Sequence, residues 1–121
     1  MKYAIVVLET DDDFAARSDE RGAEYMGAYG AYNQMLVEAG VEAGGAGLMP
    51  PSHTTALRVS NGTRHVQDGP FAEAKEQLGG LFLIEVPDLD TALEWAAKCP
   101  AAARAGVEVR PLIPPMDQAG G

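Results

Sequence analysis

Short apolar runs and amphipathic segments alternate along the chain, and their periods predict strands and helices in turn. Residues 3–8 are apolar, rich in β-branched side chains and too few for a helix, so they predict a central strand. Residues 80–86 form a second run of this kind, and residues 107–111 alternate between apolar and polar positions as a half-buried strand does. Residues 41–49 are a weaker strand candidate, because three of them are glycine.

Two other segments repeat apolar residues every three or four positions, which is the spacing of one helix face. We expect the first helix to be capped by Ser18 and to end at Gly40. The second helix is expected to begin at Asp88 and to end before Pro100. The two apolar stripes are Tyr25, Tyr29, Tyr32, Leu36 and Ala39 in the first helix, and Leu89, Ala92, Leu93, Ala96 and Cys99 in the second.

A β-hairpin is predicted in the middle of the chain. Residues 54–59 and 63–67 have strand-like composition and flank Asn61-Gly62, a pair that favours the positive φ required in a tight hairpin turn. Residues 68–80 then connect the hairpin to the next core strand. This connection begins with the turn former Asp-Gly-Pro, ends with two glycines and carries four ionisable side chains.

The predicted order is strand, helix, strand, hairpin, strand, helix, strand, which contains two β-α-β halves. It predicts an α+β fold: a ferredoxin-like protomer with an added β-hairpin, in which two helices cover one face of an antiparallel sheet. The 121 residues fit one domain at 1–116, followed by a flexible C-terminal tail at 117–121. The sheet face without helices predicts a homodimer, in which two sheets pack face to face as an α/β barrel and residues 112–116 reach across to the partner.

Charge and composition narrow the set of partners. Eighteen acidic residues against nine basic ones give a formal charge of −9, and the arginines are scattered, so no nucleic-acid binding is expected. No apolar run approaches the roughly 20 residues of a membrane span and no leader precedes the first strand, so we expect a cytoplasmic protein without membrane contact. Cys99 is the only cysteine, which excludes an internal disulfide and predicts a buried, inert thiol.

Five blocks of sequence, in order along nearly the whole chain, carry a family resemblance. They are residues 68–73 (Asp-Gly-Pro-Phe-Ala-Glu), 75–80, 84–90, 92–96 and 107–111. Together they resemble the YCII-related family, and specifically its DGPF subgroup. The resemblance implies a dimeric α/β barrel of ferredoxin-like protomers, with an activity that has been suggested to be enzymatic. It also implies a genomic context, because DGPF members are often encoded beside extracytoplasmic-function sigma factors.

Two residues are candidates for acid/base catalysis. The resemblance implies a histidine on the first helix paired with an aspartate, but this chain has no histidine there, and Tyr29 takes the nearest position. A tyrosine, with an ordinary pKa of about 10, can donate a proton or orient a carbonyl but is a poor base at neutral pH, and core packing is the alternative. Asp68, at a strand end, can act as a general base at the mouth of an apolar cavity, for instance by taking a proton next to a carbonyl. Alternatively, Asp68 only forms the turn with Gly69-Pro70.

Four further residues are candidates for ligand binding: Tyr25, Arg58, Glu73 and Lys75. Glu73 and Lys75 closely follow Asp68 and can tune one another, although a solvated ion pair is the alternative. His53 and His65 lack metal-ligand spacing, and Asp11-Asp12-Asp13, predicted as a solvated turn, lacks the spacing of a calcium loop. No metal site and no cofactor are expected.

Two classes of function remain open from the sequence. The first is a protein that binds a small molecule in a cleft between helix and sheet and catalyses cofactor-independent acid/base chemistry. The second is a noncatalytic dimeric interaction module in sigma-factor signalling, an idea that rests on family context alone. A small molecule bound next to Asp68 favours the first class, and a flat, filled interior favours the second.

Overall fold

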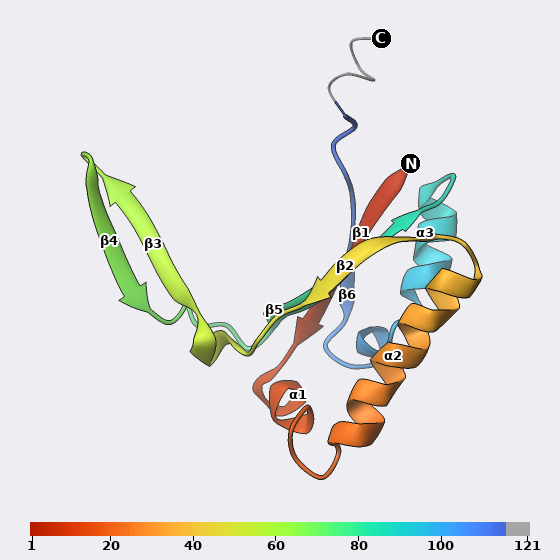
Figure 1. The fold of residues 1–121 in the computed structure, drawn as a ribbon, viewed down its shortest axis with the longest axis horizontal. Coiled ribbons are helices and arrows are strands. Elements are labelled where there is room, and N and C mark those ends of the chain that lie inside the picture. Colours follow the sequence, from red (N-terminus) through yellow and green to blue (C-terminus); the bar gives the residue numbers. More distant parts are fainter. Residues whose placement is uncertain (116–121) are drawn as a thin grey trace.

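Residues 1–115 are described by the computed structural model, in which four strands form one antiparallel sheet (Figure 1). The strands are β1 (Lys2–Glu9), β2 (Glu42–Gly47), β5 (Gln77–Glu85) and β6 (Val107–Pro111), in the order β2-β5-β1-β6. The pairs β2-β5, β5-β1 and β1-β6 are all antiparallel. This arrangement confirms the predicted α+β class and is consistent with a ferredoxin-like fold. The expected tail at 117–121 lies outside the described residues.

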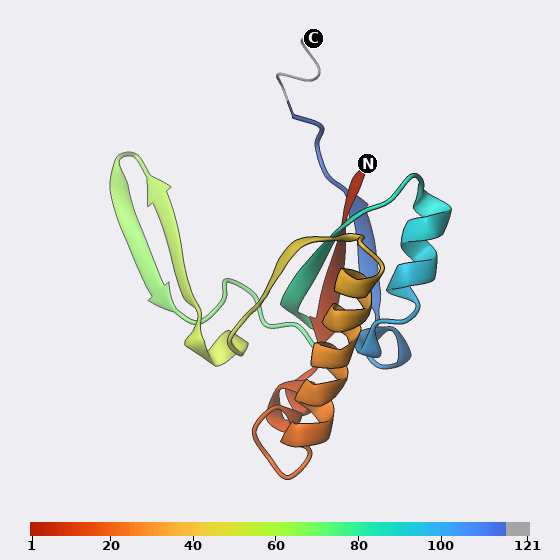
Figure 2. The ribbon, with the colours of Figure 1, turned by 45° about the vertical axis from the view of Figure 1, so that its right-hand side comes forward.

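Helices α2 (Gly22–Glu38) and α3 (Leu89–Ala96) pack on one face of the sheet (Figures 1 and 2). Alternate β1 side chains point toward them, because successive residues of a strand face opposite sides. The hydroxyl of Tyr32 on α2 donates a hydrogen bond of 2.8 Å to the carbonyl of Trp95 on α3, which links the two helices. The buried core includes Ile5, Val7, Tyr32, Leu36, Ile84, Ala92 and Ala96.

The opposite face of the sheet carries half-buried apolar side chains. Ala4, Val6 and Leu8 of β1 alternate with the buried positions of the same strand, and Leu81 and Leu83 of β5 pair with Val6 and Ala4. Helices α2 and α3 lie on the other side of the sheet, so neither of them covers this apolar face, as the sequence predicted. Within residues 1–115, no helix is both long and apolar enough to cross a membrane.

The beginning of the helical region differs from the prediction. Residues 11–13 are not a solvated turn but start a short helix, α1 (Asp11–Ala16), because Thr10 and Asp13 cap it reciprocally: each side chain accepts a hydrogen bond from the other residue's backbone N–H. Ser18 is not a helix cap, since its amide bonds the carbonyl of Ala15 in the last turn of α1. Helix α2 begins at Gly22, without a side-chain cap.

The end of the first predicted helix and the start of the second are confirmed. Gly40 adopts a φ of 74°, the left-handed conformation that commonly follows a helix. The side chain of Asp88 accepts a hydrogen bond from the backbone of Thr91 and caps α3. A short 3-10 segment, η2 (Pro100–Ala103), then leads into β6, and Cys99 before it is buried, as predicted.

The predicted hairpin forms a separate two-stranded sheet, made of β3 (Thr55–Ser60) and β4 (Thr63–Asp68). Asn61 and Gly62 at its turn have φ values of 52° and 77°, as a tight hairpin turn requires. The hairpin stands away from the main sheet and is joined to it by extended segments and the 3-10 turn η1 (Pro51–His53) (Figures 1 and 2).

Strand β5 begins three residues before the predicted position 80, and this difference matters for the site described below. Gln77 and Leu78 already pair with Glu9 and Leu8, while Gly80 pairs with Val7. The register shift leaves Gly79 as an extra residue in β5, which is a β-bulge. Residues 77–79 therefore belong to the sheet rather than to the connection.

Candidate functional site

A cavity of about 550 Å³ lies between α2 and the strands β2 and β5. This volume is typical of sites that hold a small organic molecule. Its walls are mostly backbone of glycine residues and apolar side chains, with a few polar groups from β1, α2 and the loop after α1. The lining residues that matter below are Glu9, Arg17, Tyr29, Gly79 and Phe82.

The first polar group of the cavity is the carboxylate of Glu9, whose side chain is only 3% exposed. Glu9 is the last residue of β1 and continues the buried alternation of Tyr3, Ile5 and Val7. Arg17, which directly follows α1, pairs with both carboxylate oxygens through Nε and Nη2. The hydroxyl of Tyr25 donates a hydrogen bond of 2.5 Å to Oε2. A buried carboxylate is thus charge-compensated and held in one orientation.

Gly79 makes room for this carboxylate. A Cβ atom built on Gly79 would lie 1.8 Å from Oε1 of Glu9, far inside van der Waals contact. The carbonyl of Gly79 also accepts a hydrogen bond of 3.1 Å from Nη2 of Arg17, and Arg17 donates another to the carbonyl of Leu48. The bulge in β5 therefore supplies both the space and part of the polar frame around Glu9.

Tyr29 contributes the second polar group. Its ring lies between the rings of Tyr25, at 5.5 Å between centroids, and Phe82, at 6.4 Å and nearly parallel. Its hydroxyl oxygen is buried and has no hydrogen-bond partner within residues 1–115. Burial, with a smaller contribution from the charge of Glu9, outweighs the opposing effect of the neighbouring Tyr25 hydroxyl and raises the pKa of Tyr29 to about 12. At neutral pH the phenol is therefore a protonated donor, and no acceptor within residues 1–115 lies in hydrogen-bond geometry with it.

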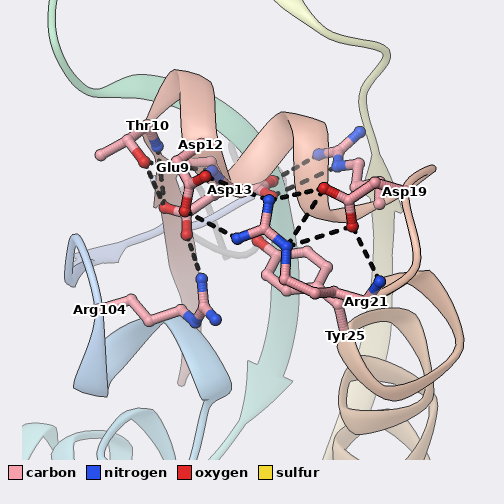
Figure 3. A network of polar contacts seen from close by, with 9 residues as sticks. Glu9, Thr10, Asp12, Asp13, Asp19, Arg21, Tyr25 and Arg104 are labelled. Carbon is pink, nitrogen blue, oxygen red and sulfur yellow. Dashed lines mark hydrogen bonds and ion pairs between the residues drawn. The ribbon is translucent and has the colours of Figure 1, made fainter.

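A second ion pair supports the site from the side of α1 (Figure 3). Asp13, buried in the first turn of α1, accepts a hydrogen bond from Nη1 of Arg104, and the Arg104 guanidinium lies 5.0 Å from the ring centre of Tyr25. Burial alone would raise the pKa of Asp13, but hydrogen bonds from Thr10 and Arg104 outweigh it and hold the pKa below its usual value. The contact with Arg104 holds the ring of Tyr25, whose hydroxyl in turn donates to Glu9.

Figure 3 also shows a more exposed ion cluster next to this pair. Arg21 bonds both Asp12 of α1 and Asp19 of the following loop. Hydrogen bonds to the two carboxylates raise the pKa of Arg21 above its usual range, and the same contact lowers the pKa of Asp19. This cluster holds the turn between α1 and α2 and does not line the cavity.

The candidate residues from the sequence fall into two groups. Tyr25 and Tyr29 meet beside the cavity. Asp68 does not: it is exposed at the end of β4, opposite Thr55, and is absent from the cavity lining. Tyr29 and Asp68, which were expected to share one cleft, therefore do not line the same cavity.

The remaining candidates lie near the hairpin. The guanidinium of Arg58 lies 4.3 Å from the ring centre of Phe71. Glu73 and Lys75 line a second cavity, of about 590 Å³, with Asp11 and Gln77. A functional role stays a prediction for four residues: Asp68, Arg58, Glu73 and Lys75.

Sequence reasoning missed Glu9 and Arg17. A signal for Glu9 was present, because it occupies the fourth position of an alternating buried series in which the other three residues are apolar. A charged residue at such a position requires a partner. No comparable signal pointed to Arg17, which follows a helix that was itself not predicted. In the described part of the chain, no three His, Cys, Asp or Glu side chains are grouped as metal ligands.

Comparison with known proteins agrees with this fold. The chain is 39% identical over 114 residues to an uncharacterized protein of Rhizobium meliloti, an alignment that covers 93% of this chain and 92% of that protein. The fold of this chain is similar to that of a 5-chloro-2-hydroxyhydroquinone dehydrochlorinase from Burkholderia phenoliruptrix, solved in complex with 2,5-dihydroxybenzoquinone. That likeness has a TM-score of 0.54 and 16% identity, over 97% of this chain and 98% of the other. Residues 1–115 match the YCII-related domain, and the chain therefore belongs to the YCII-related family.

Proposed function

We propose that this protein binds a small ring compound with a hydroxyl or carbonyl oxygen in the cavity beside α2, and performs acid/base chemistry on it without a cofactor. The observation that carries the proposal is the buried hydroxyl of Tyr29, which has no partner within residues 1–115 and lies at a cavity that also holds Glu9. A buried donor left unsatisfied costs about 1–3 kcal/mol. An acceptor oxygen on a ligand would recover that free energy.

The chemistry follows from the two groups. Glu9 takes a proton from a carbon next to a carbonyl, or from a hydroxyl, and the electron pair left behind resides on the ligand oxygen as an enolate or phenolate. Tyr29 stabilises that negative oxygen by donating its O–H. The carboxylate has about four acceptor positions, of which Arg17 and Tyr25 use three, so one remains for the proton.

Charge and shape favour a neutral, flat ligand. Glu9 and Glu42 line the cavity against one arginine, so a negatively charged compound would be repelled. The parallel rings of Tyr29 and Phe82 present an aromatic surface to the cavity, and glycines of β2 and β5 leave another part of its lining without side chains. The dehydrochlorinase that shares the fold is named for a small hydroxylated ring, which supports the same class.

We also propose a subgroup, an assembly and a preferred class of function for this protein. The Asp-Gly-Pro-Phe segment supports placement in the DGPF subgroup. The half-buried apolar face of Ala4, Val6 and Leu8 supports a homodimer with two sheets face to face, in the manner of a dimeric α/β barrel. The cavity supports small-molecule binding over the alternative of a noncatalytic signalling module.

Backbone NMR with a named probe tests the location of the site. We would titrate the protein with 2-hydroxyhydroquinone, kept reduced, and map the shifted amides. Shifts at Gly44–Gly47 and Gly79–Gly80 are expected. Shifts confined to residues 69–75 would instead favour the second cavity beside Asp68, and no shifts at millimolar probe would refute this ligand class.

A further inference from the structure

The β3-β4 hairpin, residues 55–68, is an arm that makes a sheet of its own. In both views it stands clear of the main sheet and its helices (Figures 1 and 2). Every residue of β4 and all but one of β3 are exposed. Two strands alone are marginally stable in water, and three or more strands or a packing partner are usually needed. The arm thus lacks the cover that its own chain gives to the rest of the fold.

One face of the arm is largely apolar. The register places Leu57 opposite Val66 and Val59 opposite Arg64, so these four side chains lie on the same face. The polar pair Thr55 and Asp68 lies at the base of that face. Leu57, Val66 and Val59 are 49%, 58% and 61% exposed. On the other face, Arg58 lies opposite His65 and packs on Phe71. The arm therefore has a polar face that is partly covered by its own chain and an apolar face that is not.

The charge of the arm is opposite to that of the remaining chain. Residues 55–68 contain Arg58 and Arg64 against one carboxylate, Asp68, at the end of β4. The other 17 acidic residues lie outside the arm, together with only seven of the nine basic ones. The surface that complements a basic and apolar arm is thus present on every copy of this protein, at the same concentration as the arm itself.

We infer that the apolar face of the arm packs on a second copy of this chain, with Arg64 paired to a carboxylate of that copy. The side chains of Leu57, Val59 and Val66 are then removed from water at the contact, and the arm gains the packing partner that a two-stranded sheet needs. This contact is distinct from the face-to-face packing of the main sheets and from the cavity, and it does not depend on the proposed function. In this arrangement the arm of each protomer packs on the surface of the other.

Sedimentation velocity on matched variants tests the inference. Leu57→Ser combined with Val66→Ser removes an opposed pair from the apolar face, while His65→Ser alters the other face. We expect wild type and His65→Ser to dimerise at micromolar protein, and the double variant to raise the dimer dissociation constant about tenfold or more. A monomeric wild type, or a double variant that dimerises as tightly as wild type, would overturn the inference.

A second pair of variants guards against simple misfolding of the arm. Arg64→Gln removes the charge on the apolar face and should weaken the dimer, with the effect disappearing at high salt. His65→Gln should leave the dissociation constant unchanged. Hydrogen exchange of the arm amides in wild type should slow as protein concentration rises. Exchange that is independent of concentration would count against a second copy as the cover.

Discussion

A Cβ atom on Gly79 would lie 1.8 Å from Oε1 of Glu9. The buried carboxylate can therefore occupy its position only because residue 79 of β5 has no side chain. The bulge that carries Gly79 lets β5 pass beside a charged group that a regular strand would cover with a side chain. Arg17 completes the arrangement by bonding both the carboxylate and the carbonyl of Gly79.

Gly79→Ala should displace Glu9 from Arg17. Loss of a buried ion pair costs about 3–5 kcal/mol, so we expect a drop of that order in the free energy of unfolding, measured by urea denaturation. Gly27→Ala is the matched control, because Gly27 lies inside α2 with no atom within 4 Å of the added Cβ. That control should gain about 0.5–1 kcal/mol. Equal stability of Gly79→Ala and wild type would show that the carboxylate is not fixed as described.

Glu9→Gln and Asp68→Asn distinguish the two candidate bases. With 2-hydroxyhydroquinone in D₂O, the protein should speed the exchange of ring hydrogens beyond the rate in buffer, as followed by proton NMR. Glu9→Gln keeps the size of the side chain but loses the proton acceptor, so it should abolish the acceleration. Asp68→Asn should retain it, because Asp68 is exposed and absent from the cavity lining. The reverse pattern would move the catalytic role to Asp68.

Asp13 should make stability depend on acid pH. Its pKa is lower in the folded protein than in the unfolded chain, so its contribution is present above the unfolded pKa, near 4, and is lost as the pH falls through the folded value. Asp13→Asn should therefore reduce the free energy of unfolding by about 2 kcal/mol at pH 7 and by less near pH 3. A reduction of the same size at both pH values would contradict the role of the charged pair with Arg104.

Cys99 should be unreactive until the protein unfolds. The thiol is buried, and that burial raises its pKa despite a backbone contact from Ala101 that lowers it. The thiolate is the reactive form, so modification by a thiol reagent at pH 8 should be slow in buffer and fast in denaturing urea. Rapid modification of the native protein would show that the core around η2 opens more readily than its packing indicates.

The parts of the fold that depend on local chemistry could be predicted. Asn61-Gly62, Gly40 and Asp88 each meet a backbone requirement that their own residue types satisfy, and each is found where expected. The predicted start of the helical region was wrong, because Ser18 was expected to cap the first helix, whereas Thr10, which has a reciprocal partner in Asp13, caps an earlier one. A choice between caps depends on such pairs rather than on one residue.

The candidate site was less predictable, because it arises from strand register. Tyr25 and Tyr29 lay on a recognisable helical stripe. Glu9 and Gly79 come from β1 and β5, which are distant in sequence, and only the bulge at Gly79, opposite Val7 and Leu8, brings them together. The density of charge at residues 68–76 drew attention to the connection after the hairpin, whereas the buried charges are Glu9, at the end of the first strand, and Asp13, shortly after it.

Calorimetric titration of 2-hydroxyhydroquinone, kept reduced, into wild type and Tyr29→Phe tests the central claim most directly. Removing the unpartnered hydroxyl should leave the melting temperature unchanged or slightly higher, because no hydrogen bond within residues 1–115 is lost. The same change should weaken binding about tenfold, since the ligand loses the donor that the site holds for it. Equal affinity of the two proteins for the probe, or no binding to wild type, would contradict the proposed role of this cavity.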